Sequence, residues 1–247
     1  MMKQFKKIKE KHPDAFLFFR CGDFYEMFGA DAVQASSILD ITLTKRGDIP
    51  MCGVPYHSVD VYIAKMIKSG NKIAICEQLE DPKTVKGIVK RDVTQVITPG
   101  TLVEENILTN KSNNFLFALN IKGLYIEISY LDLSTGDFEV NEIEYTNDLF
   151  LLKGELIRIN PKEILVPENI WSNNKNIREI FEEHEHILVN RFPCWYFEDS
   201  ENGSVYPNRI VYTLNDKPEA NNSLYLVVKF ILDRRPDIRK DFATGSL

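Results

Sequence analysis

Several features that mark common protein classes are missing from this sequence. Its 247 residues contain only four cysteines, which are widely scattered and form no C-x-x-C pair. A zinc site or a redox pair is therefore not expected, and reduced cytosolic thiols are the simpler interpretation. No apolar run approaches the ~20 residues that cross a bilayer. The basic N-terminus has no apolar core or cleavage site of a signal peptide, so we expect a cytoplasmic protein with no membrane partner.

Histidine is as scarce as cysteine, with four residues in the chain. His184 and His186 lie two positions apart, so they do not share a helix face, and glutamates surround them. A G-x-x-x-x-G-K-[ST] sequence is also absent, which removes the usual loop for nucleotide phosphates. From these absences we predict no metal, no cofactor and no catalytic residue in this chain.

Charge is present in both signs but unevenly distributed. The formal net charge is −6. Residues 1–100 hold 15 Lys and Arg against 12 Asp and Glu, which gives +3, whereas residues 101–247 hold 15 against 24, which gives −9. Any polyanionic partner is therefore expected to meet the first part of the chain.

The spacing of apolar residues predicts an α/β protein with two domains. In the first part we expect helices over 2–12, 27–40 and 58–70, strands over 15–21, 41–47, 71–78 and 91–98, and a loop at the Pro- and Gly-rich residues 49–57. The Asn-rich residues 102–114 are predicted to form a linker. The second part predicts a β-meander over 115–145, helices over 147–160 and 174–187 with a strand at 162–167 between them, and a looser pattern after about residue 205.

A turn at Gly22-Asp23 places an aromatic ring and a carboxylate close together. Phe24 and Glu26 are two positions apart, so in an extended segment their side chains point the same way. Other phenylalanines nearby already supply core aromatics. An apolar wedge can enter a base stack, and a carboxylate beside it can accept a hydrogen bond from a base edge. An intact base pair costs more to unstack than a mispair, which favours binding at a weak point in a duplex.

Five stretches in the first part resemble one family closely. They are "FRCGDFYEMFGADA", "LDITLTKRG", "PMCGVPYHSVDVYIAKMIKSG", "IAICEQLEDP" and "VTQVITPGT". All five, in this order, resemble the mismatch-recognition domain of the MutS family of bacterial DNA mismatch repair proteins. The resemblance implies a mixed-sheet recognition domain over residues 1–101. The phrases "YLDLSTGDF" and "INPKEILVPE" resemble the connector domain of that family, which is similar to ribonuclease H. The connector is expected over 115–247, with an atypical end after about 205.

The resemblance also implies roles for individual residues. Phe24 would be the ring inserted from the minor groove at a mispair, and Glu26 the acceptor for the displaced base. Lys45 and Arg46 would lie close to the sugar–phosphate backbone, and Met51 would flank the kinked step. Basic contacts to phosphate would then explain why the first part carries positive charge. The implied partner is mismatched double-stranded DNA.

Members of the MutS family are longer than this chain and continue into clamp and ATPase domains. ATP, magnesium and dimerisation belong to those domains, so we expect this chain not to be an enzyme and to dimerise only where they are present. The connector of the family also engages a MutL-like factor. Localisation is expected to be cytoplasmic, at the nucleoid.

Two alternatives remain open at this stage. The second domain could be a magnesium-dependent nuclease, because active members of the ribonuclease H fold bind magnesium through a strand aspartate. Asp132 is the candidate, with Asp137, Glu139 and Glu155 as further carboxylates. The other alternative is an inactive fragment of a split gene, because recognition domains without their clamp lose avidity.

Overall fold

The computed structural model describes residues 1–80, 85, 87–103, 113–193 and 221–235. They form two compact units that divide between Thr98 and Pro99. We refer to them as the first and second units. The sequence placed the boundary after residue 101, whereas Pro99–Val103 lies in the second unit. Residues 104–112 of the predicted linker, and most of the predicted atypical end, lie outside the described residues.

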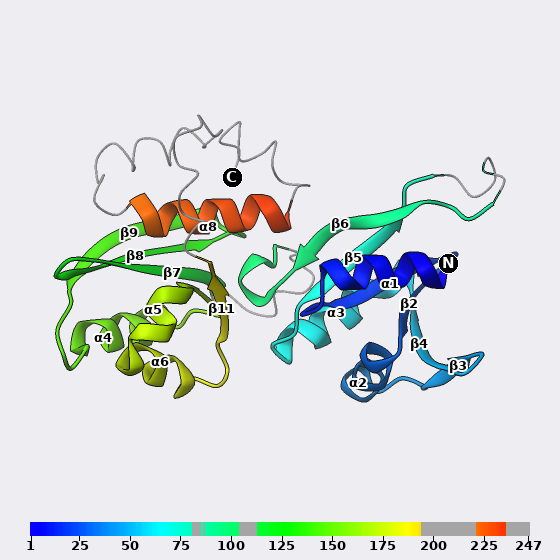
Figure 1. Ribbon diagram of the computed structural model, residues 1–247, viewed down its shortest axis with the longest axis horizontal. Coiled ribbons are helices and arrows are strands. Elements are labelled where there is room, and N and C mark those ends of the chain that lie inside the picture. The colour runs from blue at the N-terminus through cyan, green and yellow to red at the C-terminus, as the bar shows by residue number, and fades with distance from the viewer. Residues whose placement is uncertain (81–84, 86, 104–112, 194–220, 236–247) are drawn as a thin grey trace. The chain divides into compact units, whose positions relative to one another are not determined.

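The first unit is one mixed six-stranded sheet with three α-helices (Figure 1). Its elements are α1 (Met2–Lys11), β1 (Phe16–Cys21), β2 (Phe24–Phe28), α2 (Ala30–Leu39), β3 (Thr44–Arg46), β4 (Ile49–Pro55), a 3-10 turn (Tyr56–Ser58), α3 (Val59–Lys68), β5 (Ile73–Gln78) and β6 (Arg91–Ile97). The strand order is β3-β4-β2-β1-β5-β6, with β1 and β5 parallel and the other neighbours antiparallel. The predicted mixed-sheet α/β class is confirmed.

Helix α1 packs on the face of this sheet that holds Phe19 and Phe28. Its apolar side buries Phe5 and Ile8. The Phe5 ring makes edge-on contacts with Phe19 of β1 and Phe28 of β2, at centroid distances of 5.6 and 4.9 Å. Such aromatic pairs add to the free energy gained from burying their surface. The core therefore fixes β1 and β2 side by side beneath α1.

Two predictions for the first unit are wrong. Residues 49–57 are not a loop: β4 occupies Ile49–Pro55 and pairs with both β2 and β3. Pro50 and Pro55 lie near the two ends of that strand, where a missing N–H is tolerated. Met27 and Phe28 belong to β2 rather than to the following helix, which begins at Ala30.

The second unit is a mixed five-stranded sheet with helices on both faces (Figure 1). Its elements are a 3-10 turn (Pro99–Thr101), β7 (Phe115–Lys122), β8 (Tyr125–Asp132), β9 (Asp137–Glu144), α4 (Phe150–Ile159), β10 (Glu163–Pro167), α5 (Glu168–Asn173), α6 (Lys175–Glu182), β11 (Leu188–Phe192) and α8 (Asn221–Arg234). The strand order is β11-β10-β7-β8-β9. The predicted meander is β7-β8-β9, while β10 runs parallel to both β7 and β11.

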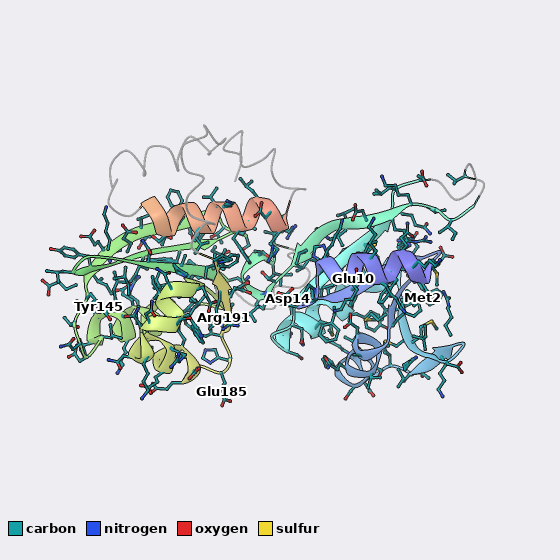
Figure 2. All side chains as sticks on the ribbon, in the orientation of Figure 1. Met2, Glu10, Asp14, Tyr145, Glu185 and Arg191 are labelled. Atoms are coloured by element: carbon teal, nitrogen blue, oxygen red, sulfur yellow. The ribbon has the colours of Figure 1, made fainter. Side chains whose placement is uncertain are left out.

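Two buried layers hold the second unit together. Helices α4, α5 and α6 cover one face of the sheet, and α8 covers the other (Figure 1). Within the part of the chain after residue 205, where the sequence predicted only a looser pattern, Asn221–Arg234 form α8. Tyr145 and Arg191, both labelled in Figure 2, lie toward the α5–α6 side: the Tyr145 hydroxyl donates to Asn174, and the Arg191 guanidinium lies over the Trp171 ring. No helix in the described ranges is both long and apolar enough to cross a bilayer.

The 3-10 turn at the start of the second unit is fixed to its sheet by buried polar groups. The Gly100 N–H donates to Glu163 Oε2 at 2.9 Å, and the Asn114 side chain donates to the Pro99 carbonyl at 2.6 Å. A Cβ at position 100 would lie 2.9 Å from Glu163 Cβ and 3.0 Å from Leu116 Cδ1. Gly100 is therefore the residue that this close approach requires.

Candidate nucleic-acid interface

The β1–β2 hairpin sets the position of Phe24. Its turn uses Gly22 at a φ of +60°, a conformation that glycine adopts without strain. Cys21 and Phe24 pair directly across the turn, and the Tyr56 N–H donates to the Asp23 carbonyl at 2.9 Å. Phe24 is therefore the first residue of a strand rather than part of a free turn. Its side chain is 48% exposed, in contrast to the buried phenylalanines of β1.

Strand register brings the predicted residues onto one face, with one exception. In the β2–β4 pair, Glu26 lies opposite Gly53 and Phe28 opposite Met51, and Met51 in turn lies opposite Thr44 of β3. Because side chains alternate along a strand, Phe24, Glu26, Met51 and Arg46 share the face that carries α1. Lys45 is exposed but lies on the other face of β3.

A groove of about 610 Å³ opens beside these residues. Its lining combines the exposed Phe24 ring and the Glu26 carboxylate with small polar side chains and two apolar ones. The full set is Phe24, Glu26, Asp40, Ile41, Thr42, Thr44, Met51 and Gly53. Met51 is half-buried and also packs against the core under α1. Gly53 and the segment Asp40–Thr42 could not be assigned to the groove from local sequence patterns. Only the pairing of β4 with β2 and β3 brings them beside Phe24 and Glu26.

Glu26 is a buried carboxylate with a single cationic partner. Arg46 Nη2 donates to Glu26 Oε1 at 2.7 Å, and the two side chains are 41% and 12% exposed. The second oxygen, Oε2, is buried and accepts no hydrogen bond. Burial, and then a hydrogen bond from this thiol to the Glu26 carboxylate, raise the pKa of the Cys21 thiol to about 12. Arg46 and the Cys21 thiol thus both engage this carboxylate, while Oε2 itself has no N–H or O–H donor.

The opposite face of the same hairpin carries a second aromatic group that the sequence analysis did not single out. The Arg20 guanidinium lies 3.6 Å from the centre of the Tyr56 ring, which is 42% exposed. The buried Tyr25 hydroxyl donates to Glu77, and burial followed by that contact raises the pKa of Tyr25. These contacts hold the end of β4 against β1, and so support the turn that carries Phe24.

The carboxylates proposed for a nuclease do not form a site. Asp132 accepts from the Asn114 N–H at 2.7 Å and from both the N–H and the hydroxyl of Ser134, at 2.9 and 2.6 Å. The Ser134 bonds to Oδ1 form the β8–β9 turn, and the Asn114 bond to Oδ2 links that turn to the start of β7, so both oxygens are used. Within the described ranges, no group of three His, Cys, Asp or Glu is placed to hold a metal ion.

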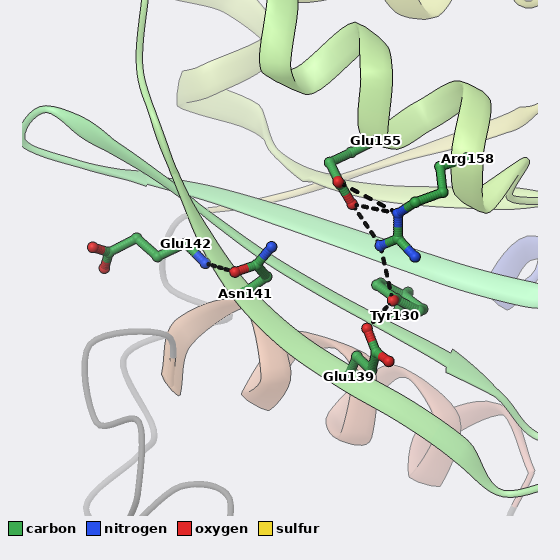
Figure 3. A network of polar contacts seen from close by, with 6 residues as sticks. All are labelled: Tyr130, Glu139, Asn141, Glu142, Glu155 and Arg158. Carbon is green, nitrogen blue, oxygen red and sulfur yellow. Dashed lines mark hydrogen bonds and ion pairs between the residues drawn. The ribbon is translucent and has the colours of Figure 1, made fainter.

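Glu139 and Glu155 are engaged with neutral or basic partners instead (Figure 3). The Tyr130 hydroxyl donates to Glu139, and Arg158 donates to Tyr130 at 2.9 Å and to Glu155 at 2.6 Å. The pKa of Tyr130 is raised, first by burial and then by Glu139. This network links α4 to β8 and β9, so the nuclease alternative is not favoured.

Comparison with known proteins assigns both units. Residues 1–106 match MutS domain I, and residues 114–205 match MutS domain II. The chain is 49% identical over 191 residues to the DNA mismatch repair protein MutS of Syntrophomonas wolfei, which covers 72% of this chain and 22% of that protein. It is 48% identical over 180 residues to the protein of the same name from Staphylococcus aureus, and this match covers 71% of this chain and 20% of that protein.

A solved structure of the HTLV-2 integrase catalytic core domain in complex with magnesium also matches, over 39% of this chain and 80% of that one. Its sequence identity is 14% and its TM-score 0.24, so it supports no conclusion. The chain spans about a fifth of the length of the curated relatives that it matches. Through its two matched domains, the chain belongs to the MutS family.

Proposed function

We propose that the first unit binds mismatched double-stranded DNA, with Phe24 as an apolar wedge and Glu26 as the acceptor for a displaced base. The observation that supports this most directly is that an exposed aromatic ring and a glutamate side chain line one groove. A phenylalanine that served only the core would be buried, as its neighbours in β1 are. Base–aromatic stacking is worth ~1–3 kcal/mol per base, which offsets part of the cost of opening a base step.

Arg46, Met51 and Lys45 have separate roles in this proposal. Met51 would lie beside the opened base step, because it lines the same groove. Lys45 faces away from the groove and is exposed, so it would contact a phosphate rather than a base. The guanidinium of Arg46 is engaged with Glu26 and lies near the same groove.

The second unit is proposed to act as a connector without chemistry of its own. Neither unit is proposed to need ATP, magnesium or another cofactor. Contact with a MutL-like factor through the second unit, and dimerisation with the clamp and ATPase domains of a longer MutS protein, are further parts of the proposal. A cytoplasmic location at the nucleoid is also proposed, because the DNA partner lies there.

The test compares a duplex holding one G·T mispair with its matched duplex, using fluorescence anisotropy at ~50 mM salt to strengthen weak binding. The wild-type chain is expected to prefer the mispair. Phe24→Ala is expected to lower affinity for the mispair by about tenfold, from the lost stacking. Phe150→Ala removes the same ring from a 72% exposed position in the second unit and serves as the matched control. Equal binding of both duplexes by the wild-type chain would refute the proposal.

A further inference from the structure

Arg46 is held in place by contacts within the first unit. Besides its 2.7 Å bond to Glu26, Nη1 lies 3.1 Å from the Met1 sulfur, and the guanidinium carbon lies 5.6 Å from the centre of the Phe28 ring. Register explains the arrangement, because Arg46 ends β3 on the same face as Glu26. An arginine with three contacts from its own chain has less freedom to reach a phosphate than an exposed, extended one.

The two oxygens of Glu26 are not equivalent. Oε1 accepts from Arg46, whereas Oε2 is buried and accepts nothing. Gly53, directly opposite on β4, leaves space beside the carboxylate: a Cβ there would lie 3.3 Å from the Tyr25 carbonyl oxygen and 3.7 Å from Glu26 Cγ. A buried acceptor without a partner is costly, so a hydrogen bond from a ligand to this carboxylate would be favourable.

We infer that Arg46 is a positioning residue for Glu26 and thereby sets the preference for a mispair. It binds one carboxylate oxygen, Oε1, and thereby holds the Glu26 side chain in place beside the groove that this residue lines. This inference rests on the function proposed above and assigns to Arg46 a role that differs from a simple backbone contact.

The two roles predict different results. A phosphate contact contributes the same binding free energy on every DNA sequence. Its loss makes the salt dependence shallower, because the magnitude of the slope of log K against log salt falls by about 0.9. A positioning contact changes only the ratio of mispair to matched affinity. It also acts through Glu26, so removing Arg46 has no effect once Glu26 is gone.

The experiment measures Kd for G·T and matched duplexes at several salt concentrations. The proteins are the wild-type chain, Arg46→Gln, Glu26→Gln, the double variant, and Lys45→Gln as the neighbouring control on the opposite face. Arg46→Gln is expected to reduce the mispair ratio by about tenfold, as Glu26→Gln does, with no further loss in the double variant. Its matched affinity and salt slope stay unchanged. Lys45→Gln weakens both duplexes equally and lowers the slope.

Arg46→Lys separates positioning from folding. A single nitrogen–oxygen contact links the pair, so the lysine is expected to restore the ratio to within about threefold of wild type by the same charge-assisted bond. If Arg46→Gln lowers both affinities equally and reduces the salt slope, the inference is overturned while the proposed function stands. If Phe24→Ala abolishes the mispair ratio and Arg46→Gln leaves it intact, the inference alone fails. A wild-type chain without mispair preference overturns both.

Discussion

Three buried carboxylates, Glu163 and Asp132 in the second unit and Glu26 in the first, are bonded in different ways. In the second unit, Glu163 accepts from the Gly100 N–H and from the Asn190 side chain, and Asp132 accepts two hydrogen bonds from Ser134 in its own turn and one from the Asn114 N–H. In the first unit, Glu26 accepts from Arg46 through Oε1 and is hydrogen-bonded to the Cys21 thiol, while Oε2 has no N–H or O–H donor. A buried acceptor whose oxygens are all used stabilises the fold. One with an unused oxygen beside a groove is available to a ligand.

The largest effect expected from the loss of hydrogen bonds is at Glu163. Glu163→Ala leaves two buried donors without acceptors, at ~1–3 kcal/mol each, so we expect the second unit to lose about 3 kcal/mol of unfolding free energy. Glu26→Ala is the matched control and is expected to cost under ~1 kcal/mol, because the partly exposed Arg46 can be hydrated. Urea denaturation followed by tryptophan fluorescence reports the Glu163 variant, since both tryptophans lie in residues 115–247. Far-UV circular dichroism reports the Glu26 variant. Equal losses would remove the distinction between the two units.

Asp132→Asn tests the same distinction together with the nuclease alternative. The amide keeps the shape of the carboxylate but loses one acceptor, so we expect a loss of about 2 kcal/mol in the second unit. The wild-type chain is expected not to cleave DNA in the presence of magnesium. Magnesium-dependent cleavage that disappears in Asp132→Asn would contradict the structural role given to this residue.

Raising the pH above 9 should lower the stability of the first unit more than that of the second. Burial raises the pKa of Cys52 to about 11 and that of Cys76 to about 12, from an ordinary value of 9.0. Above pH 9 the unfolded chain loses these protons while the folded chain keeps them, so stability is intact below pH 9 and falls above it. Each thiol contributes at most ~1.4 kcal/mol per pH unit.

The measurement is urea unfolding at pH 8 and pH 10 under reducing conditions. Far-UV circular dichroism should show an earlier transition at pH 10, while tryptophan fluorescence shifts less, because the described residues of the second unit include no cysteine. Cys76→Ala is the control and should reduce the pH dependence. An identical pH dependence in that variant would assign the effect to other groups.

The smallest stability effect is expected at Phe24. Because nearly half of its side chain is exposed, Phe24→Ala should change the free energy of unfolding by less than ~0.5 kcal/mol, while it removes the mispair preference. Phe19→Ala in β1, fully buried, should cost about 3–5 kcal/mol. Thermal unfolding of both variants tests the contrast, and a large loss for Phe24→Ala would place its ring in the core instead.

Local sequence patterns predicted much of the fold and part of the site. The two-residue spacing of Phe24 and Glu26 was enough to place them on one face. The pairing of Glu26 with Arg46 was not predictable from local patterns, because it requires β4 to lie between β2 and β3. That strand was hidden by its prolines and glycine, which usually indicate a loop. Strand β11 was also not predicted. It follows a charged segment directly, and it is defined by its parallel pairing with β10, which is a tertiary contact.

Gly100 has a consequence for genetic experiments. It has no contact with the groove, yet any side chain at this position meets Glu163 and Leu116 within 3.0 Å. A mutagenesis screen that scored only loss of mismatch binding would recover substitutions at Gly100 alongside those at Phe24, through a lower yield of folded protein. Measuring the amount of soluble chain for each allele would separate the two classes.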